Sequence, residues 1–387
     1  MGIEYKDDVN NLLDFDIEKR KTALKNIEKK IKEEKIKNSH IKEDLLNLHI
    51  HSFNSFNYLN WSPSRIILEG FLKGLKYVGI VDFDTIEAVE ETRFASEILG
   101  VSAINGFETR VFINQWQDKV INSPGEPGIY YFCGIGFKKN SKSGFFLNLQ
   151  NISKKRNKKV IENLNYFLPD IAIDYEKDVI PLTPSGNPTE RHIVSAFYKK
   201  SEKVFKEKIM DFWSGILNLS ADEVFNMKKE DLLEKIRIKL IKSGGPGYIF
   251  PQKETFPLIE EVIENTIKEG GIPVGTWLDG TNDGENNPYE HTGFLMEKGI
   301  KAIMIIPERN WNIKNPEEKR IKIENLKKFI EVCKSKRIPV VPGTEMNKFG
   351  QPFIDDFNQP VLKENLPYFL ESAKTIFSSK LFLLPDR

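Results

Sequence analysis

The chain contains, in this order, the segments LLNLHIHS (residues 45–52), SPSRIILEGFLKGLK (62–76) and YVGIVDFD (77–84). The first and third segments are short and apolar, which predicts two β-strands. The middle segment has helical spacing, with Ser62 as its cap and Pro63 at its first helical position. A strand, a helix and a second strand in succession predict parallel strands in an α/β fold.

This alternation continues on both sides of a different middle part. A helix over 86–100 and a strand over 101–112 follow directly, and strands and helices resume after residue 257. In between, residues 136–186 are polar and irregular, whereas residues 187–256 have mainly helical spacing. The sequence therefore predicts a helical domain inserted into a βα barrel or a layered sheet. The later strands are expected at 272–280, 300–307 and 338–347.

An accessory helix is expected ahead of the first strand. Residues 17–37 place apolar side chains, including Leu24 and Ile27, at near-helical spacing among many Lys and Glu residues. This pattern is typical of an exposed helix with one narrow apolar stripe. The predicted organisation is a helical extension (1–44), a first α/β part (45–186), an inserted helical domain (187–256) and a second α/β part (257–387).

The composition excludes several classes of protein. The 387 residues include 57 Lys and Arg against 56 Asp and Glu, so the net charge of +1 does not indicate a nucleic-acid or bilayer partner. Cys133 and Cys333 are the only cysteines, which excludes a disulfide framework and a Cys-rich zinc module. No apolar run reaches the ~20 residues that span a membrane, and the N-terminus is acidic. We therefore expect a cytoplasmic protein.

Two histidines mark the first candidate site. His49 and His51 lie two residues apart at the end of a predicted strand, so their side chains share one face at its carboxyl end. Such a pair can hold a divalent ion with help from carboxylates, although two nearby histidines can also be ordinary surface residues. Glu108 and Glu345 each end an apolar strand, where α/β enzymes place their chemistry. These four residues are the predicted metal ligands.

At this point the sequence resembles the polymerase and histidinol phosphatase (PHP) family. The resemblance covers LHIHSFNS, SPSRIILEGFLKGLKYVGIVDFDT, NGFE, TERHIVSAF, GGPGYIFPQKETFPLIEEVIENTIKEGGIPV and PGTEMN. The chain is similar to the phosphoesterases of that family that carry an inserted helical domain. The resemblance implies a distorted seven-stranded βα barrel that binds two or three Mn, Fe, Zn or Mg ions and hydrolyses phosphate esters.

Several metal-ligand positions of that family are changed in this chain. Phe56, Phe83 and Trp277 stand where the resemblance implies ligands of a second ion, and Tyr131 and Asn347 stand where it implies ligands of a third. Aromatic rings cannot replace imidazole as ligands. His49, His51, Glu108 and Glu345 match the ligands of one ion, so the expectation is a partly degenerate site that holds one divalent ion beside an apolar wall.

Other residues are candidates for proton transfer and substrate binding. Asp82, Asp84 and His192 could move a proton, but the two aspartates could instead orient the ligands, and His192 could make only a local hydrogen bond at a helix start. Arg191 and Arg309 could clamp an anion, although surface arginines are common. Substrate contacts are also expected from the changed positions Tyr131, Trp277 and Asn347.

Two functions are compatible with this pattern. The first is a PHP-type metal-dependent hydrolase, acting on a small phosphoester through a reduced metal site. The second is a catalytically silent PHP domain that binds a small molecule or a partner through the aromatic-walled cleft. Nucleic-acid processing is the weakest alternative, since no basic patch accompanies the motifs. The sequence also lacks a phosphate-binding P-loop and a GxSxG nucleophile motif.

Overall fold

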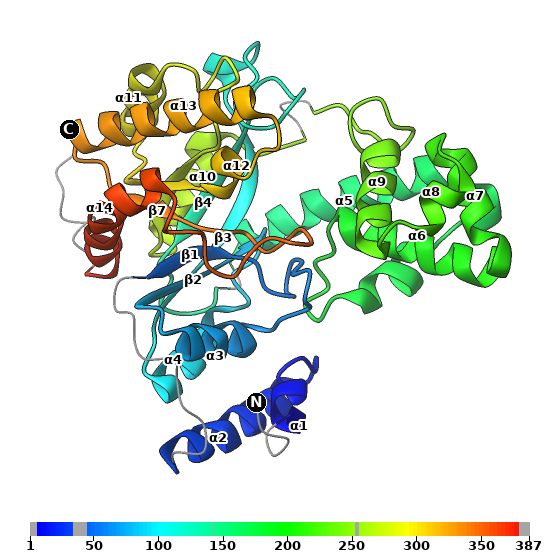
Figure 1. The fold of residues 1–387 in the computed structure, drawn as a ribbon, viewed down its shortest axis with the longest axis horizontal. Coiled ribbons are helices and arrows are strands. Elements are labelled where there is room, and N and C mark those ends of the chain that lie inside the picture. The colour runs from blue at the N-terminus through cyan, green and yellow to red at the C-terminus, as the bar shows by residue number, and fades with distance from the viewer. Residues whose placement is uncertain (1–5, 34–44, 142, 252–254, 379–387) are drawn as a thin grey trace.

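The computed structural model describes residues 6–33, 45–141, 143–251 and 255–378. Its centre is one sheet of seven strands in sequence order, curled into a nearly closed barrel (Figure 1). The outer pairs are parallel, whereas β4 runs antiparallel to both β3 and β5. The predicted distorted seven-stranded α/β barrel is therefore confirmed. The strands are β1 (Leu46–Ile50), β2 (Tyr77–Phe83), β3 (Ser102–Phe112), β4 (Ile129–Ile135), β5 (Ile272–Trp277), β6 (Ala302–Ile305) and β7 (Val340–Pro342).

Helices cover the outside of this barrel. Ser62 caps α3 through its side chain, and Gly100 ends α4 in the left-handed conformation, as the sequence predicts. Gly74 ends α3 in the same conformation, slightly before the expected end of that helix. The barrel helices are α3 (Pro63–Lys73), α4 (Val89–Leu99), α10 (Ile259–Lys268), α11 (Pro288–Glu297), α12 (Glu308–Trp311), α13 (Pro316–Ser335) and α14 (Pro360–Phe377). In the described part of the chain, no helix is long and apolar enough to cross a membrane.

The barrel closes where β1 meets the segment that follows β7. The amides of Thr344 and Glu345 donate to the carbonyl of His49 at 3.1 and 2.8 Å, and the amide of His51 donates to the carbonyl of Glu345 at 2.8 Å. Gly343 makes this approach feasible, because a Cβ atom there would lie 2.1 Å from the Cβ atom of His49. The seam therefore passes directly through the two histidines.

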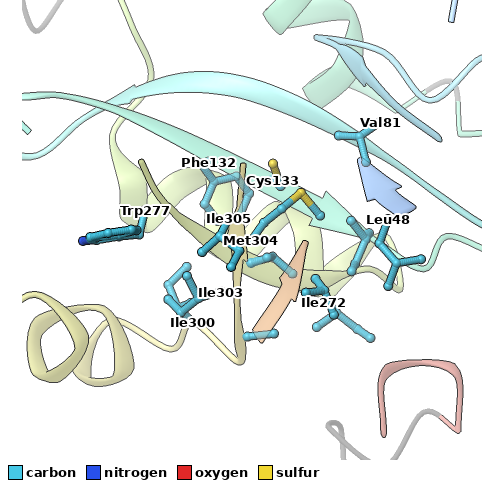
Figure 2. Packing of buried hydrophobic residues seen from close by; sticks show 14 of the residues in the cluster. Leu48, Val81, Phe132, Cys133, Ile272, Trp277, Ile300, Ile303, Met304 and Ile305 are labelled. Carbon is cyan, nitrogen blue, oxygen red and sulfur yellow. The ribbon is translucent and has the colours of Figure 1, made fainter. Parts of the chain in front are cut away.

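Side chains on both faces of the central strands are buried and form the barrel core. Strands β5 and β6 are buried along their whole length, as expected for strands covered on both sides. Figure 2 shows how Leu48, Phe132 and Ile303 pack together in this cluster with their neighbours. Trp277 also belongs to the cluster, where its ring stacks on Phe329 with centroids 4.4 Å apart.

The inserted helical part has a hydrophobic core of its own and lies to one side of the barrel (Figure 1). The later part of the long helix α5 belongs to it, since Val160, Ile161 and Leu164 pack in that core. The start of α5 packs in the barrel core instead, through Phe145, Phe146 and Leu149. The helical part therefore begins before the expected residue 187, within a stretch whose many Lys and Asn residues obscure its apolar spacing. Its helices are α5 (Gly144–Phe167), α6 (Glu190–Phe205), α7 (Ile209–Leu217), α8 (Ala221–Phe225) and α9 (Lys229–Ile241).

The N-terminal extension forms α1 (Lys6–Asn11) and α2 (Ile17–Lys32), which pack below α3 and α4 in Figure 1. A buried ion pair holds it in place, with Arg20 donating to Glu91 of α4 at 2.6 and 2.9 Å. Leu24 and Ile27 lie in the same hydrophobic cluster as α3. The expected helix is therefore confirmed as far as the structure describes it, and residues 34–44 lie outside the described residues.

The seam yields a prediction about stability. Gly343→Ala would force β1 and β7 apart at His49, so we expect the free energy of unfolding to fall by about 3 kcal/mol or more. The matched control is Gly293→Ala in α11, where an added Cβ meets only the end of Lys336 and should be neutral or stabilising. Urea unfolding of both variants measures the difference. Equal stabilities would contradict closure of the barrel at Gly343.

A buried histidine yields a prediction about pH. Burial lowers the pKa of His291 to about 4, and its Nδ1 atom donates to the carbonyl of Gly284 at 2.8 Å. Between pH 4 and the ordinary pKa of about 6.5, the unfolded chain binds more protons at this residue than the native chain does. Stability should therefore fall as the pH drops through this window, by up to about 1.4 kcal/mol per pH unit from this group.

Thermal unfolding of chelator-treated protein at several pH values tests this expectation. The variant His291→Gln should show a smaller loss of stability on acidification than the parent protein. Parallel curves for the two proteins would mean that another group causes the acid sensitivity.

Candidate metal centre

Two histidines at the carboxyl end of β1 meet one glutamate within β3. The Nε2 atoms of His49 and His51 lie 3.2 and 3.1 Å from Oε2 of Glu108, and 3.3 Å from each other. All three side chains are buried. Within the described part of the chain, this is the one group of His, Cys, Asp and Glu side chains with the proximity that a metal ion requires.

The spacing of these atoms fits one divalent ion. Ligands bound at about 2.0–2.2 Å from a metal lie about 3 Å from one another, as these three atoms do. Two imidazole nitrogens and a carboxylate oxygen suit zinc, iron and manganese. His49, His51 and Glu108 therefore fit the divalent ion that the sequence predicts.

A hydrogen-bond relay prepares His51 for this role. Its Nδ1 atom lies 3.1 Å from Oγ of Ser55, and that hydroxyl donates to Oδ1 of Asp82 at 2.7 Å. Because the Ser55 proton goes to Asp82, the Ser55 oxygen can accept a hydrogen bond from Nδ1–H of His51, and in this tautomer Nε2 carries no proton toward the site. Phe83 supports the ring from one side, stacked at 4.8 Å between centroids. Hydrogen bonding and stacking together fix the orientation of His51.

Asp82 serves this relay and lies outside the cavity wall. It is fully buried and accepts further hydrogen bonds from the amide and hydroxyl of Ser52, both at 2.7 Å. This arrangement corresponds to the alternative in which the aspartate orients a ligand. The carboxylate has no free path to a substrate, so the expectation that Asp82 transfers protons is not supported by its position.

The charges around the centre keep the carboxylate ionised. Burial alone would raise the pKa of Glu108, but the adjacent imidazoles of His49 and His51 hold it well below its ordinary value. Burial would lower the pKa of His51, yet Glu108, Asp82 and Glu345 raise it. Nδ1 of His49 is buried and has no hydrogen-bond partner among the described residues. The ring of His49 therefore lacks the support that Ser55 gives to His51.

Glu345 does not join the three ligands, contrary to the expectation. Its two oxygens accept from Nη2 of Arg309 at 3.0 and 2.9 Å, and Oε2 also accepts from Gln351 at 3.1 Å. Arg309 keeps the pKa of this carboxyl below its ordinary value despite burial. Glu345 and Met346 both have left-handed backbone conformations, with φ of 63° and 53°, which turn the chain after the seam. The side chain consequently meets Arg309 instead of the His-His-Glu group.

A cavity of about 1060 Å³ opens beside the three ligands. His49 and Glu108 line it from the barrel, and α5, α6 and α9 of the helical part close the opposite side. Its volume suits a small organic molecule. Of the changed positions, Phe56, Phe83, Tyr131 and Asn347 all line the cavity, as expected for an aromatic-walled cleft.

Trp277 is a correction to the expected substrate contacts. Its side chain is fully buried and stacks on Phe329 in the barrel core. Figure 2 labels Trp277 among the buried residues of this cluster. The residues that line the cavity include its neighbours Thr276 and Leu278 instead. The alternation of a β-strand explains the outcome, since Trp277 points to the opposite face from both neighbours.

Asp84 is the cavity-lining carboxyl with the most unusual surroundings. Its Oδ1 atom accepts from Thr109 at 2.6 Å, and its backbone is left-handed with φ of 54°. Burial raises the pKa of Asp84 to about 6, although Thr109 and Arg110 act in the opposite direction. Asp84 therefore lines the cavity, and its expected part in proton transfer stays a prediction.

His192 makes a local hydrogen bond at the start of α6 and does not line the cavity. Its Nδ1 atom accepts the amide of Thr189 at 3.0 Å, forming a capping box at the start of α6. Burial and the charge of Lys199 lower its pKa to about 3, so the ring is neutral. It packs against Phe56 and is not among the residues that line the cavity. The predicted catalytic role is therefore replaced by the local alternative.

Arg191 does line the cavity, but with its charge partly neutralised. Its Nη1 atom donates to Glu234 of α9 at 2.6 Å, and the guanidinium lies over the ring of Phe56. Burial and the neighbouring Arg237 lower its pKa, so positive charge is concentrated on this wall. An anionic group in the cavity would reduce that repulsion.

Further basic residues on the same wall were missed in the sequence. Arg110 lies two residues after Glu108 on β3, so both side chains share one face, and this spacing could have been noticed. Arg156, Arg237 and Lys242 come from the helical part and surround Glu190, with contacts of 3.0, 3.3 and 2.8 Å. Their meeting depends on helix packing, which no local sequence pattern shows.

Comparisons with known proteins support the fold. The structure is similar to that of a protein from Bifidobacterium adolescentis described as a candidate metal-dependent phosphoesterase, with a TM-score of 0.51 and 18% identity over 84% of this chain and 96% of that one. It is also similar to an amidohydrolase from Chromobacterium violaceum solved with bound sulfate and no metal, with a TM-score of 0.52 and 15% identity over 83% and 95%. No protein-family model and no curated protein sequence matches this chain.

The site yields a prediction about metal content. Alanine at His49, His51 or Glu108 should remove the bound divalent ion, because each change deletes one of three ligands. Glu345→Gln is the matched control, since its carboxylate is held by Arg309 outside the group. Elemental analysis of metal-loaded, desalted protein measures the difference. Loss of the ion in Glu345→Gln, or its retention in His51→Ala, would contradict the assignment of ligands.

Proposed function

We propose that this protein is a metal-dependent hydrolase of a small phosphate ester that uses one divalent ion. The observation that carries this proposal is the buried group of His49, His51 and Glu108 at the wall of a small-molecule cavity. A divalent ion held there would lower the pKa of a water molecule and act as a Lewis acid toward the phosphoryl group. Mn, Fe, Zn and Mg are the candidates for this ion.

The charge of the cavity supports a phosphate ester as the substrate. Arg309, Arg191 and Arg110 all line it, and guanidinium groups bind phosphate oxygens through paired hydrogen bonds. The descriptions of the two similar structures, a phosphoesterase and a sulfate-bound amidohydrolase, agree with metal-assisted hydrolysis and an anionic ligand. Tyr131 and Asn347 would contact the rest of the substrate from the same wall.

The chain itself would supply proton transfer. Oδ1 of Asp84 is used by Thr109, so Oδ2 would accept the proton of the attacking water as the new bond to phosphorus forms. The bond from phosphorus to the ester oxygen would then break, the leaving oxygen would take up one proton from solvent to give the alcohol, and Asp84 would release its proton to solvent. Asp82 would contribute indirectly by holding Ser55 and His51 in place.

The alternative is a catalytically silent domain that binds a small molecule in the same cavity. The rings of Phe56, Phe83 and Tyr131 on the cavity wall favour it, since they supply contact area without metal ligands. Turnover is the property that separates the two functions.

Hydrolysis by metal-loaded protein tests the proposal. Protein reconstituted separately with Mn, Fe, Zn and Mg is assayed for phosphate release from nucleotides and sugar phosphates. We expect turnover with at least one ion, its loss in His51→Ala, and a fall in kcat of about 10²–10⁴-fold in Asp84→Asn with the metal content retained.

Two results would count against this function. Metal-loaded protein that binds these compounds without releasing phosphate would favour the silent domain. Activity that survives in both His51→Ala and Glu108→Ala would show that the reaction occurs elsewhere.

A further inference from the structure

Arg309 lines the same cavity as His49 and Glu108. Arg309 belongs to α12, directly after strand β6, and its side chain is 46% exposed, whereas its partner Glu345 is only 6% exposed. Nη2 of Arg309 bridges both oxygens of Glu345. Arg309 therefore joins a buried carboxylate on one side to the cavity on the other.

The position of Glu345 fixes the place of this arginine relative to the metal centre. The backbone of Glu345 is hydrogen-bonded to both His49 and His51 across the barrel seam. Gln351 donates a further hydrogen bond to the same carboxylate, so its orientation is held from two sides. Arg309 is thus attached to the element that carries the two histidines, and the negative charges of Glu345 and Glu108 both raise its pKa.

Arg309 has hydrogen-bonding capacity beyond its pair with Glu345, and the residue lines the cavity. A guanidinium carries five N–H donors in a planar fork. In the described part of the chain, only Nη2 makes a hydrogen bond within the protein, and that bond goes to Glu345. Nε and Nη1 remain available to an oxygen-rich group in the cavity.

The charges of Glu108, Glu345 and Arg309 show what this cation adds to the site. Glu108 and Glu345 each contribute one negative charge, and Arg309 contributes one positive charge. With one divalent ion present the group carries a net positive charge, which suits a phosphate dianion, whereas without Arg309 the same group would be neutral.

We propose that Arg309 acts as the second cation of this site, binding phosphoryl oxygens beside a single divalent ion and withholding Glu345 from metal ligation. The proposal rests on the proposed function for the identity of the substrate, but its physical content concerns anion and metal binding. Arg309 contacts the substrate directly, and Glu345 is the positioning residue that holds it.

Two consequences follow for metal and phosphate. Removing Arg309 takes away a donor group and a positive charge, so inorganic phosphate should bind metal-loaded protein at least about tenfold more weakly. The same change frees the carboxylate of Glu345 next to the ligands, so the divalent ion should bind about tenfold more tightly. Replacing a residue that is needed only for folding would not weaken phosphate binding and tighten metal binding together.

Calorimetric titration with zinc, and then with inorganic phosphate, tests the proposal. Arg309→Met is compared with the parent protein and with Lys322→Met, which removes a different cavity-lining cation that is paired with Asp279 and Glu318. We expect one zinc ion per parent chain, weaker phosphate binding and tighter zinc binding only in Arg309→Met, and parent-like values in Lys322→Met.

A second pair of variants covers the case in which unpaired Glu345 prevents Arg309→Met from folding. Glu345→Gln keeps the arginine, and the double variant with Arg309→Met lacks both charges, so phosphate should bind the first but bind the second at least about tenfold more weakly. Equal phosphate affinity within this pair, or unchanged phosphate and zinc affinity in Arg309→Met, would overturn the proposal. Two zinc ions per parent chain would overturn it as well.

The outcome is separable from that of the proposed function. A parent protein that binds phosphate through Arg309 but hydrolyses no ester would contradict hydrolysis and support the role of Arg309. A parent protein that hydrolyses esters, together with an Arg309→Met variant that binds phosphate as well as the parent does, would contradict only the role of Arg309.

Discussion

The hydrogen bonds between His49, His51 and the segment after β7 are the constraint on which the rest of this structure depends. They close the barrel, and they also place the two imidazoles on its rim. His49 and His51 make the backbone hydrogen bonds that close the barrel, and their side chains are also candidate ligands. The backbone of the barrel therefore sets the geometry of the site. Glu108 needs only to project from within β3, level with the last residue of β2, to complete the group.

The rim of the barrel and the helical part contribute different charged residues around the cavity. The barrel contributes the three candidate ligands, Asp84 and Arg309, whereas the helical part contributes Arg156, Arg237 and Lys242. These basic side chains are held in ion pairs with Glu190 and Glu234, so each keeps a defined place in a partly dry environment. An anionic ligand would therefore meet cations on both sides.

Several buried polar residues support the site without reaching it. Asp82 is saturated by hydrogen bonds from Ser52 and Ser55, and His192 is used to start α6. Both are titratable, and each is next in sequence to a residue that lines the cavity, Phe83 and Arg191 respectively. This made them reasonable candidates for proton transfer. Only the direction of each side chain, set by packing, separates them from Asp84, which faces the cavity.

The sequence by itself determined the alternation of strands and helices, the cap at Ser62, the inserted helical part and the pairing of His49 with His51 on one face, because each depends on residues near one another in the chain. The role of Glu108 could also be predicted from the sequence, since this residue follows an apolar run in an α/β pattern. Only the tertiary structure decided that Glu345 turns to Arg309, that Trp277 enters the core, and that α5 joins the helical part. These outcomes depend on contacts between residues far apart in sequence and on backbone conformations at the seam, which local patterns do not encode.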